Sequence, residues 1–244
     1  MEFPGMVDLV KEGIEAVFGE QQQPEQAATD LDQYEPVVSD TGDSVATSDP
    51  FSVAPMLDYQ QGDNAYGYEG DCGLVSVSNV LQLSGIDASE DDVVQVAVEN
   101  GLCNSDPSLP PSALGGVSDE NVIALLDHYG VDAQVYYPGE AGGTYEDIAA
   151  ALENGQCVTM GVNAGYLWDE PNYVDSGNAN HQIVLTSAAR DAETGEVTGF
   201  YICDSGRWQD GDNCRFVSVE EFDACYASAG AASVIITDEA TRVV

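Results

Sequence analysis

The stretch GYEGDCGLVSVSNVLQLSG, residues 67 to 85, places one cysteine at the start of an apolar run with helical spacing. Cys72 lies between Asp71 and Gly73, and residues 73–84 are expected to form a helix that Asp71 caps. A thiol at a helix N-terminus meets unpaired backbone N–H groups and the positive end of the helix dipole, and both stabilise the thiolate. Buried cysteines are also common core residues. The stretch alone therefore leaves Cys72 open as a nucleophile or a core side chain.

A cysteine nucleophile needs a base, and the sequence contains only two histidines. His128 stands late in the helical pattern ALLDHYG, where an imidazole suits the negative end of the helix dipole. His181 begins the strand pattern HQIVLTSA, after a loop rich in glycine and asparagine. A polar residue at the start of a strand can face a cleft, while the rigid backbone of the strand holds it in place. This placement favours His181 as the general base.

The third group of the candidate site is Asp204. Strand patterns cover residues 181–190 and 197–204, and the linking residues DAETGE have turn chemistry, which predicts an antiparallel hairpin. In such a pair the start of one strand lies beside the end of the next, so His181 and Asp204 should be neighbours. A carboxylate at that place would orient the imidazole. We therefore predict a catalytic triad of Cys72, His181 and Asp204.

Helical patterns dominate the first part of the domain and strand patterns the second, which is typical of an α+β fold. Ser89, Ser118 and Thr144 are expected to cap three of the helices. Helices are expected over residues 73–84, 90–100, 119–129 and 145–154. Strands are expected over residues 132–137, 157–163, 181–190, 197–204 and 233–238. The helical part should pack on an antiparallel sheet that carries the histidine and the aspartate.

The same residues resemble the papain-like cysteine peptidase superfamily. The closer likeness is to bacterial papain-fold domains akin to double-glycine leader peptidases, including those of polymorphic toxins. The matching segments follow the family's order over roughly residues 60–225: GDCGLVSVSNVLQLSGI, GGVSDENVIALLDHYGVDAQVY, TYEDIAAALENGQCVTMGVNAGYLW, NHQIVLTSA and GFYICDSG. The resemblance implies a papain-like fold, with Cys72 as nucleophile, His181 as general base and acid, and Asp204 as orienting residue.

The sequence departs from this family at the residue that donates to the oxyanion. Such enzymes carry a glutamine shortly before the cysteine, and Tyr66 occupies that position here. Gln61 stands further upstream, and the glycines between it and Cys72 would let the chain bring its amide to the same place. We expect Gln61 to supply the oxyanion donor. Tyr66 and Trp168 are candidates for the wall of a substrate cleft, although Trp168 equally suits a core aromatic residue.

Three regions are expected along the chain. Residues 1–19 carry apolar side chains at alternating spacings of three and four and predict an amphipathic helix. Residues 20–50 are polar and acidic and indicate a flexible linker. Residues 51–244 are expected to form the papain-like hydrolase domain.

Acidic side chains greatly outnumber basic ones: 44 Asp and Glu against 5 Lys and Arg give a formal net charge of −39. No Lys or Arg stands between Lys11 and Arg190. Nucleic-acid and anionic-membrane partners require clustered cations, so we exclude both. The acidity suits a surface tuned to solubility or to high salt. It also fits a basic partner, such as an immunity or adaptor protein that binds the acidic surface or the N-terminal helix.

The six cysteines include no C-x-x-C pair, which argues against a structural zinc site, and we expect neither metal nor cofactor. Cys203 and Cys214 are the pair best placed for a disulfide in an oxidising compartment. The first residues lack the basic and apolar segments of an ordinary secretion signal, and no apolar run is long enough to span a bilayer. We therefore expect a cytoplasmic protein or one exported by a specialised system.

The predicted triad indicates acyl transfer through a thioester, and the favoured function is a cysteine peptidase acting on a protein or peptide. A glutamine deamidase or transglutaminase of the toxin type would use the same chemistry. A non-catalytic binding module on a papain-like scaffold is another alternative, indicated by the displaced glutamine. The last alternative is an acidic partner protein that acts through its N-terminal helix and linker.

Overall fold

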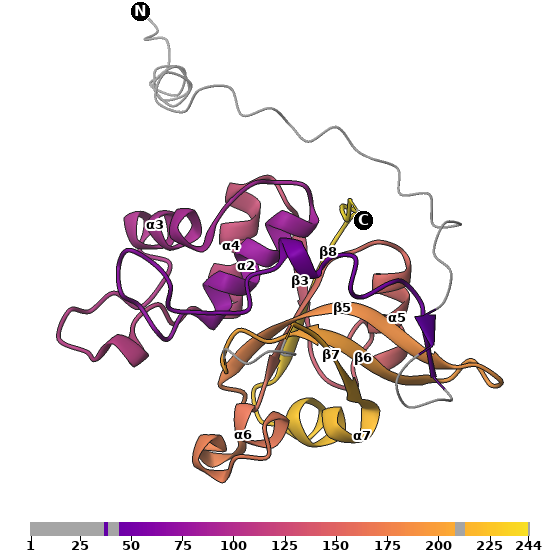
Figure 1. The fold of residues 1–244 in the computed structure, drawn as a ribbon. Helices are drawn as coiled ribbons and strands as arrows, with labels where there is room; N and C mark the ends of the chain where they lie inside the picture. Colours follow the sequence, from indigo (N-terminus) through magenta and orange to yellow (C-terminus); the bar gives the residue numbers. More distant parts are fainter. Residues whose placement is uncertain (1–36, 39–43, 208–212, 244) are drawn as a thin grey trace, which may run out of the picture.

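The computed structural model describes residues 37–38, 44–207 and 213–243. Over these residues the chain forms one eight-stranded antiparallel sheet combined with helices (Figure 1). This mixture of helices and antiparallel strands agrees with the α+β class expected from the sequence. The expected helix over residues 1–19 lies outside the described residues.

The strands form a branched order around β5. One side of β5 pairs with β4 and, further along, with β2, while its other side pairs with β6. Beyond these lie β8 and β3 on the β4 side, β1 next to β2, and β7 next to β6. The strands are β1 (Val37–Val38), β2 (Ser44–Ala46), β3 (Ala133–Tyr136), β4 (Val158–Val162), β5 (His181–Asp191), β6 (Val197–Cys203), β7 (Asn213–Ser218) and β8 (Ser233–Thr237).

The four expected helices and the five expected strands are all present, with ends within one or two residues of the sequence patterns. Short elements that carry too few residues for a clear periodicity were not expected: β1, β2, β7, α6 and α7. The helices are α2 (Cys72–Leu83), α3 (Glu90–Asn100), α4 (Asp119–His128), α5 (Tyr145–Glu153), α6 (Ala164–Leu167) and α7 (Val219–Phe222).

Two apolar cores lie on opposite faces of the sheet. On one face, buried side chains of α2, α3 and α4 pack with Val184 and Ile235. On the other face, α5 and α7 pack with Ile183, Leu185 and Phe200. Neighbouring residues of β5 thus point into different cores, as the two-residue period of a strand requires. Because β5 is covered on both faces, its start at His181 is held by rigid surroundings.

Serine and threonine caps begin three of the helices, as expected. The side chain of Ser89 accepts from the Asp92 backbone N–H in a reciprocal capping box, and Ser118 and Thr144 cap α4 and α5. The expected cap at Asp71 is wrong, because this side chain makes no capping hydrogen bond to α2. Its carboxylate is buried instead and accepts a hydrogen bond from Nδ2 of Asn64 at 3.0 Å.

The expected linker of residues 20–50 needs a correction at its C-terminal end. Residues 44–46 form β2, which pairs with residues 189–191 of β5, and the backbone N–H of Thr47 donates to the Ala188 carbonyl at 2.8 Å. Main-chain pairing alone can add a strand to a free sheet edge, so β2 could form without an apolar periodicity that would have predicted it from the sequence. The structured part therefore begins before residue 51; most of the range 20–50 lies outside the described residues.

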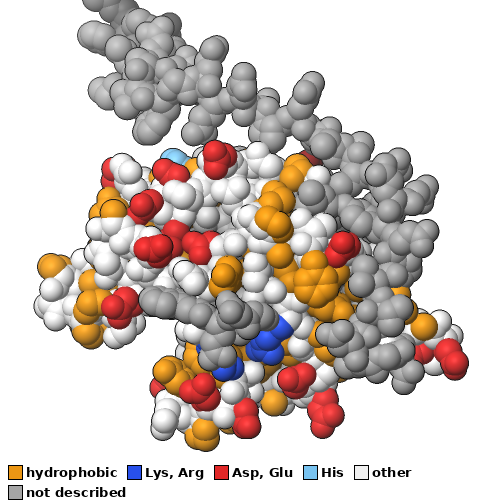
Figure 2. All heavy atoms as spheres, viewed as in Figure 1, with side chains coloured by type: hydrophobic (Ala, Val, Ile, Leu, Met, Phe, Trp, Pro, Cys, Tyr) orange, Lys and Arg blue, Asp and Glu red, His pale blue; other side chains and the backbone are white. Residues whose placement is uncertain are grey.

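Acidic side chains are spread over the face of the molecule in Figure 2, whereas Lys and Arg side chains gather in one place. Within the described ranges, no helix combines the length and apolar character needed to cross a bilayer.

Candidate active site

Cys72 is the first residue of α2, whose 12 residues end at Leu83. The Asp71 carbonyl accepts from the backbone N–H groups of Leu74 and Val75, which closes the first turn of the helix directly behind the thiol. The Cys72 side chain is partly exposed. Gly73 lets the helix approach Val117, because a Cβ there would lie 2.3 Å from a Val117 methyl. The helix start thus presents the thiol while its next residue is packed inside.

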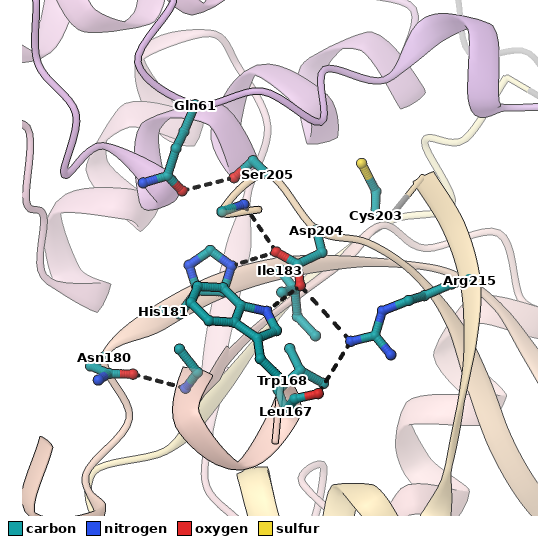
Figure 3. Close-up of polar contacts among 12 residues, drawn as sticks. Gln61, Leu167, Trp168, Asn180, His181, Ile183, Cys203, Asp204, Ser205 and Arg215 are labelled. Carbon is teal, nitrogen blue, oxygen red and sulfur yellow. Dashed lines mark hydrogen bonds and ion pairs between the residues drawn. The ribbon is translucent and has the colours of Figure 1, made fainter. Parts of the chain in front are cut away.

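The hairpin of β5 and β6 brings His181 and Asp204 together. The strands pair Val184 with Cys203, so the residue after β6 lies beside the start of β5. Nε2 of His181 lies 2.8 Å from Oδ1 of Asp204, and both side chains are buried (Figure 3). The proximity expected from the turn chemistry is therefore present in the structure.

Three donors surround the Asp204 carboxylate, which is 0% exposed. Besides His181, the backbone N–H of Gly206 donates to Oδ1 at 3.0 Å, and Nε1 of Trp168 donates to Oδ2 at 2.8 Å. The Arg215 guanidinium approaches Oδ2 at 3.9 Å (Figure 3). A buried carboxylate with this many donors stays ionised and fixed in orientation.

The His181 ring is held on its faces as well as at its nitrogens. Its centroid lies 5.2 Å from that of Trp168, which in turn meets Tyr173 edge-on at 5.1 Å. On Gly206, a Cβ would lie 2.9 Å from Cε1 of His181 and 2.6 Å from Cζ2 of Trp168. Only a glycine fits at this position without moving a ring.

Cys72 and His181 lie close enough for each to shift the pKa of the other. Nε2 of His181 is taken by Asp204, which leaves Nδ1 as the ring nitrogen available to the thiol. Burial opposes a charge on the thiol, but the His181 contact and the backbone N–H groups of Gln182 and Gly73 lower the pKa of Cys72 below its usual value. This is the environment of a thiolate.

The imidazole shows the complementary shift. Burial opposes its protonation, yet the hydrogen bond that it donates to Asp204 and the neighbouring Cys72 raise the pKa of His181 to about 10. Burial likewise opposes the charge on Asp204, but its bonds to His181, Trp168 and Gly206 lower the pKa of that carboxyl to about 2. At neutral pH these shifts favour a thiolate–imidazolium pair next to an ionised aspartate.

Gln61 lies between the segment that leads to Cys72 and the residue after Asp204. Its Nε2 donates to the Glu69 carbonyl at 2.8 Å, and its Oε1 accepts from Oγ of Ser205 at 3.2 Å (Figure 3). Its backbone N–H also donates to the Ser205 carbonyl at 3.1 Å. The glycine-rich loop thus brings this amide to the edge of the site, and one of its two N–H hydrogens is taken by Glu69.

The two aromatic residues expected at a cleft differ in their surroundings. Tyr66 is 42% exposed and lies against the ring of Tyr68, at 5.7 Å between centroids. Trp168 is half-buried and reaches Asp204 and His181. A role in binding substrate stays a prediction for both residues.

The remaining titratable candidates lie outside this group. His128 ends α4 and packs edge-on against Tyr129, as its helical pattern suggested. No disulfide joins Cys203 and Cys214 in this structure. No group of three or more His, Cys, Asp or Glu side chains suited to a metal ion occurs among residues 37–38, 44–207 and 213–243.

Three parts of the site escaped the sequence-based reasoning. The donor role of Trp168 toward Asp204 depends on the α6 loop, whose position no pattern gives. The rings of Trp168 and His181 crowd Gly206, and the only sign of this in the sequence was the DSG triplet of residues 204–206, which is a weak one. The contact of Asp71 with Asn64, and through it with Glu90, joins a loop to a distant helix and had no signal in the spacing.

Comparisons with known proteins add relatives of unknown activity. No family model matches the chain. An uncharacterized protein of Mycobacterium bovis and two of Mycobacterium tuberculosis strains are each 33% identical over 154 residues, which is 56% of this chain and 64% of the relative. The chain thus spans less than two thirds of the length of these relatives.

A solved structure with some likeness is that of a double glycine motif protease from an AMS/PCAT transporter in complex with the leader peptide. It shares 20% sequence identity and a TM-score of 0.38, over 69% of this chain and 84% of that chain. A TM-score this low assigns neither fold nor activity. Function is therefore argued from the residues of this chain.

Proposed function

We propose that this chain is a cysteine hydrolase that cleaves amide bonds through Cys72, His181 and Asp204, and that it acts as a peptidase. One observation carries the proposal: a single buried imidazole is hydrogen-bonded to a buried carboxylate and lies next to a cysteine at a helix N-terminus, whose pKa it lowers. Core cysteines have no need of such a partner, and a cysteine without one would stay mostly protonated at neutral pH and would be a poor nucleophile.

The reaction follows from the charges in this group. The Cys72 thiolate attacks the carbonyl carbon of the amide, and the carbonyl oxygen takes up the negative charge. The His181 imidazolium gives its proton to the leaving nitrogen, so the C–N bond breaks and a thioester remains. A water molecule then attacks the thioester while His181 takes its proton. The carboxylic acid leaves, and Cys72 returns as thiolate with His181 protonated.

The oxyanion would be stabilised by backbone and amide donors. The first turn of α2 presents unpaired N–H groups, beginning at Cys72 itself. Gln61 supports this role with the N–H hydrogen of its Nε2 that Glu69 does not take. Asp204 takes part in the reaction only through the imidazole: it accepts a hydrogen bond from Nε2 of His181 and keeps that nitrogen protonated.

The test uses the two cysteines that are both partly exposed, Cys72 and Cys103, as a matched pair within one protein. Burial and the charge of Asp71 raise the pKa of Cys103, whereas the pKa of Cys72 is lowered. Iodoacetamide at neutral pH should therefore alkylate Cys72 at least about tenfold faster, read by mass spectrometry of the peptides. In His181→Ala this advantage should vanish. Equal rates in the unmodified protein would end the hydrolase proposal and favour a binding module.

Product analysis then separates a peptidase from a deamidase. We expect the full chain to cleave the backbone of peptides in a library, and we expect the Cys72→Ala variant to cleave none of them. Release of ammonia from glutamine side chains without backbone cleavage would instead assign deamidation to the same triad. A basic immunity or adaptor partner stays a prediction, to be tested with a chain that lacks residues 1–36 and keeps β1 and β2.

A further inference from the structure

A second cluster of buried polar groups lies directly before the nucleophile in the chain. Asn64 is at its centre: three acceptors share the two hydrogens of its Nδ2, namely the Tyr68 carbonyl at 2.7 Å, Oδ2 of Asp71 at 3.0 Å and Oε1 of Glu90 at 2.8 Å. The backbone N–H of Gly62 also donates to Oε1 of Glu90, at 3.1 Å. Glu90 is the first residue of α3, so the cluster ties the loop of residues 58–71 to a helix.

The two carboxyl groups of this cluster are almost completely removed from water. Asp71 is 0% exposed and Glu90 is 5% exposed. Oδ2 of Asp71 and Oε1 of Glu90 both lie within hydrogen-bond distance of Nδ2 of Asn64, at 3.0 and 2.8 Å, so the two carboxyl groups meet at one amide nitrogen. Oδ1 of Asp71 and Oε2 of Glu90 receive no hydrogen from any other described residue. Two ionised carboxylates this close repel each other in a buried site, and a proton held between them removes that repulsion.

We propose that Asp71 and Glu90 share one proton and act as positioning residues, which hold the loop of residues 58–71 and through it Cys72 and Gln61 at the candidate site. The inference rests on the proposed function for what the loop positions. Asp71 precedes the nucleophile in the chain, and Glu90 binds the backbone of Gly62, which follows Gln61. The pair therefore fixes both ends of the segment that carries the thiol and the amide.

The charges around the pair make the shared proton necessary. Asp58 and Glu90 raise each other's tendency to stay protonated, Asp63 adds to the effect on Asp58, and Cys72 and Cys103 are near enough to Asp71 to interact with its charge. Asp91, next to Glu90 in α3, accepts from the Ala65 backbone N–H at 2.6 Å. All of these groups are neutral or negative, and the sequence has no Lys or Arg between Lys11 and Arg190.

The sign of the pH dependence follows from these surroundings. Burial, with the bond to Asp71, raises the pKa of Glu90 to about 8, and burial raises the pKa of Asp71 to about 6. The closed loop thus keeps a proton on Glu90 that an opened loop would release near its usual pKa of 4.5. Opening should become about tenfold easier for each pH unit up to about 8 and should level off above that value.

Hydrogen exchange measures this opening without a substrate. The full chain is exchanged at about pH 6, 7 and 8, and protection of peptides within residues 58–71 is corrected for the intrinsic exchange rate. We expect protection to fall about tenfold per unit in the unmodified protein. Glu90→Gln should remove the slope, because its amide donates to Asp71 at every pH. Glu99→Gln, which removes an exposed carboxyl from the same helix, should keep the slope.

Two outcomes would overturn the proposal. One is protection that does not change with pH in the unmodified protein, or a slope that survives both in Glu90→Gln and in Asp71→Asn. The other is loss of protection at neutral pH on adding EDTA, regained with calcium, because a cation and not a proton would then join the carboxyls. Asp71→Asn keeps the test valid if Glu90→Gln does not fold.

The positioning role has its own measurement. Glu90→Ala removes the acceptor of the Gly62 N–H and one acceptor of Asn64, and it should slow iodoacetamide alkylation of Cys72 at least about tenfold at neutral pH. Glu90→Gln should restore most of that rate. An alkylation rate in Glu90→Ala equal to that of the unmodified protein would refute positioning. Failure of the proposed function looks different: Cys72 would then react no faster than Cys103 while the exchange slope remains.

Discussion

The bond from Trp168 to Asp204 offers a quantitative test of how the site is held. In Trp168→Phe an aromatic ring remains beside His181, but Nε1 no longer donates to the carboxylate at 2.8 Å. A hydrogen bond to a charged group contributes about 1.5–3 kcal/mol. The smaller ring adds a packing loss of about 1 kcal/mol. The free energy of unfolding should therefore fall by about 2.5–4 kcal/mol in total.

A double-mutant cycle separates the hydrogen bond from the packing. In Asp204→Asn the group facing the indole can become an amide nitrogen, which cannot accept the hydrogen. In the Asp204→Asn background, Trp168→Phe should therefore lower the free energy of unfolding only by its packing loss. The coupling energy between the two substitutions should reach about 1.5 kcal/mol or more. The assay is urea unfolding of the four proteins at neutral pH. A coupling energy below about 0.5 kcal/mol would show that the indole only fills space.

The pH dependence of unfolding of the same proteins provides a second test of the bond between Trp168 and Asp204. Burial opposes the charge on Asp204, but its three donors depress its pKa to about 2. A depressed carboxyl pKa stabilises the folded state above its ordinary value of 3.8, and this stabilisation is lost as pH falls toward 2. Trp168→Phe removes one donor and raises this pKa, so acid unfolding should begin at a higher pH. An unchanged acid midpoint would contradict the assigned bond.

Further predictions follow from crowding, from thiol chemistry and from charge. Gly206→Ala places a Cβ 2.9 Å from the His181 ring and should slow Cys72 alkylation, whereas Gly116→Ala, which meets nothing within 4 Å, should not; equal rates in both variants would rule out crowding at the imidazole. Because the pKa of Cys72 is lowered and that of Cys103 is raised, alkylation of Cys72 should change little between about pH 7 and 9, while that of Cys103 should rise steeply; parallel profiles would refute the ion pair. With a formal net charge of −39, the melting temperature should rise as sodium chloride increases from about 0.05 to 1 M, since the screening length falls to about 3 Å; a flat or falling curve would mean local compensation of the acids.

Much of the fold was open to sequence reasoning because its signals are local. The period of apolar residues marked α2 to α5, and the Ser89, Ser118 and Thr144 caps marked three of their starts. The hairpin of β5 and β6 followed from turn residues between two strand patterns. Since an antiparallel register follows from such a turn, the proximity of His181 and Asp204 could be predicted before any coordinates. The strand β2 could not, because a sheet edge recruits it through backbone groups that every sequence has.

By itself the sequence determined the chemistry that this protein has available: one cysteine at a helix start, two histidines to choose between, and 5 basic against 44 acidic side chains. The tertiary structure decided which side chains surround those groups. Trp168 reaches Asp204 across 36 residues, and Asn64 reaches Glu90 across 26. Contacts of this kind depend on how loops pack against distant elements, and no short-range spacing records them. Asp71 shows this difference. Its position before α2 suggested a helix cap, but in the structure its side chain makes no capping hydrogen bond. Its carboxyl group is buried instead, and we propose that it shares a proton with Glu90 of the neighbouring helix.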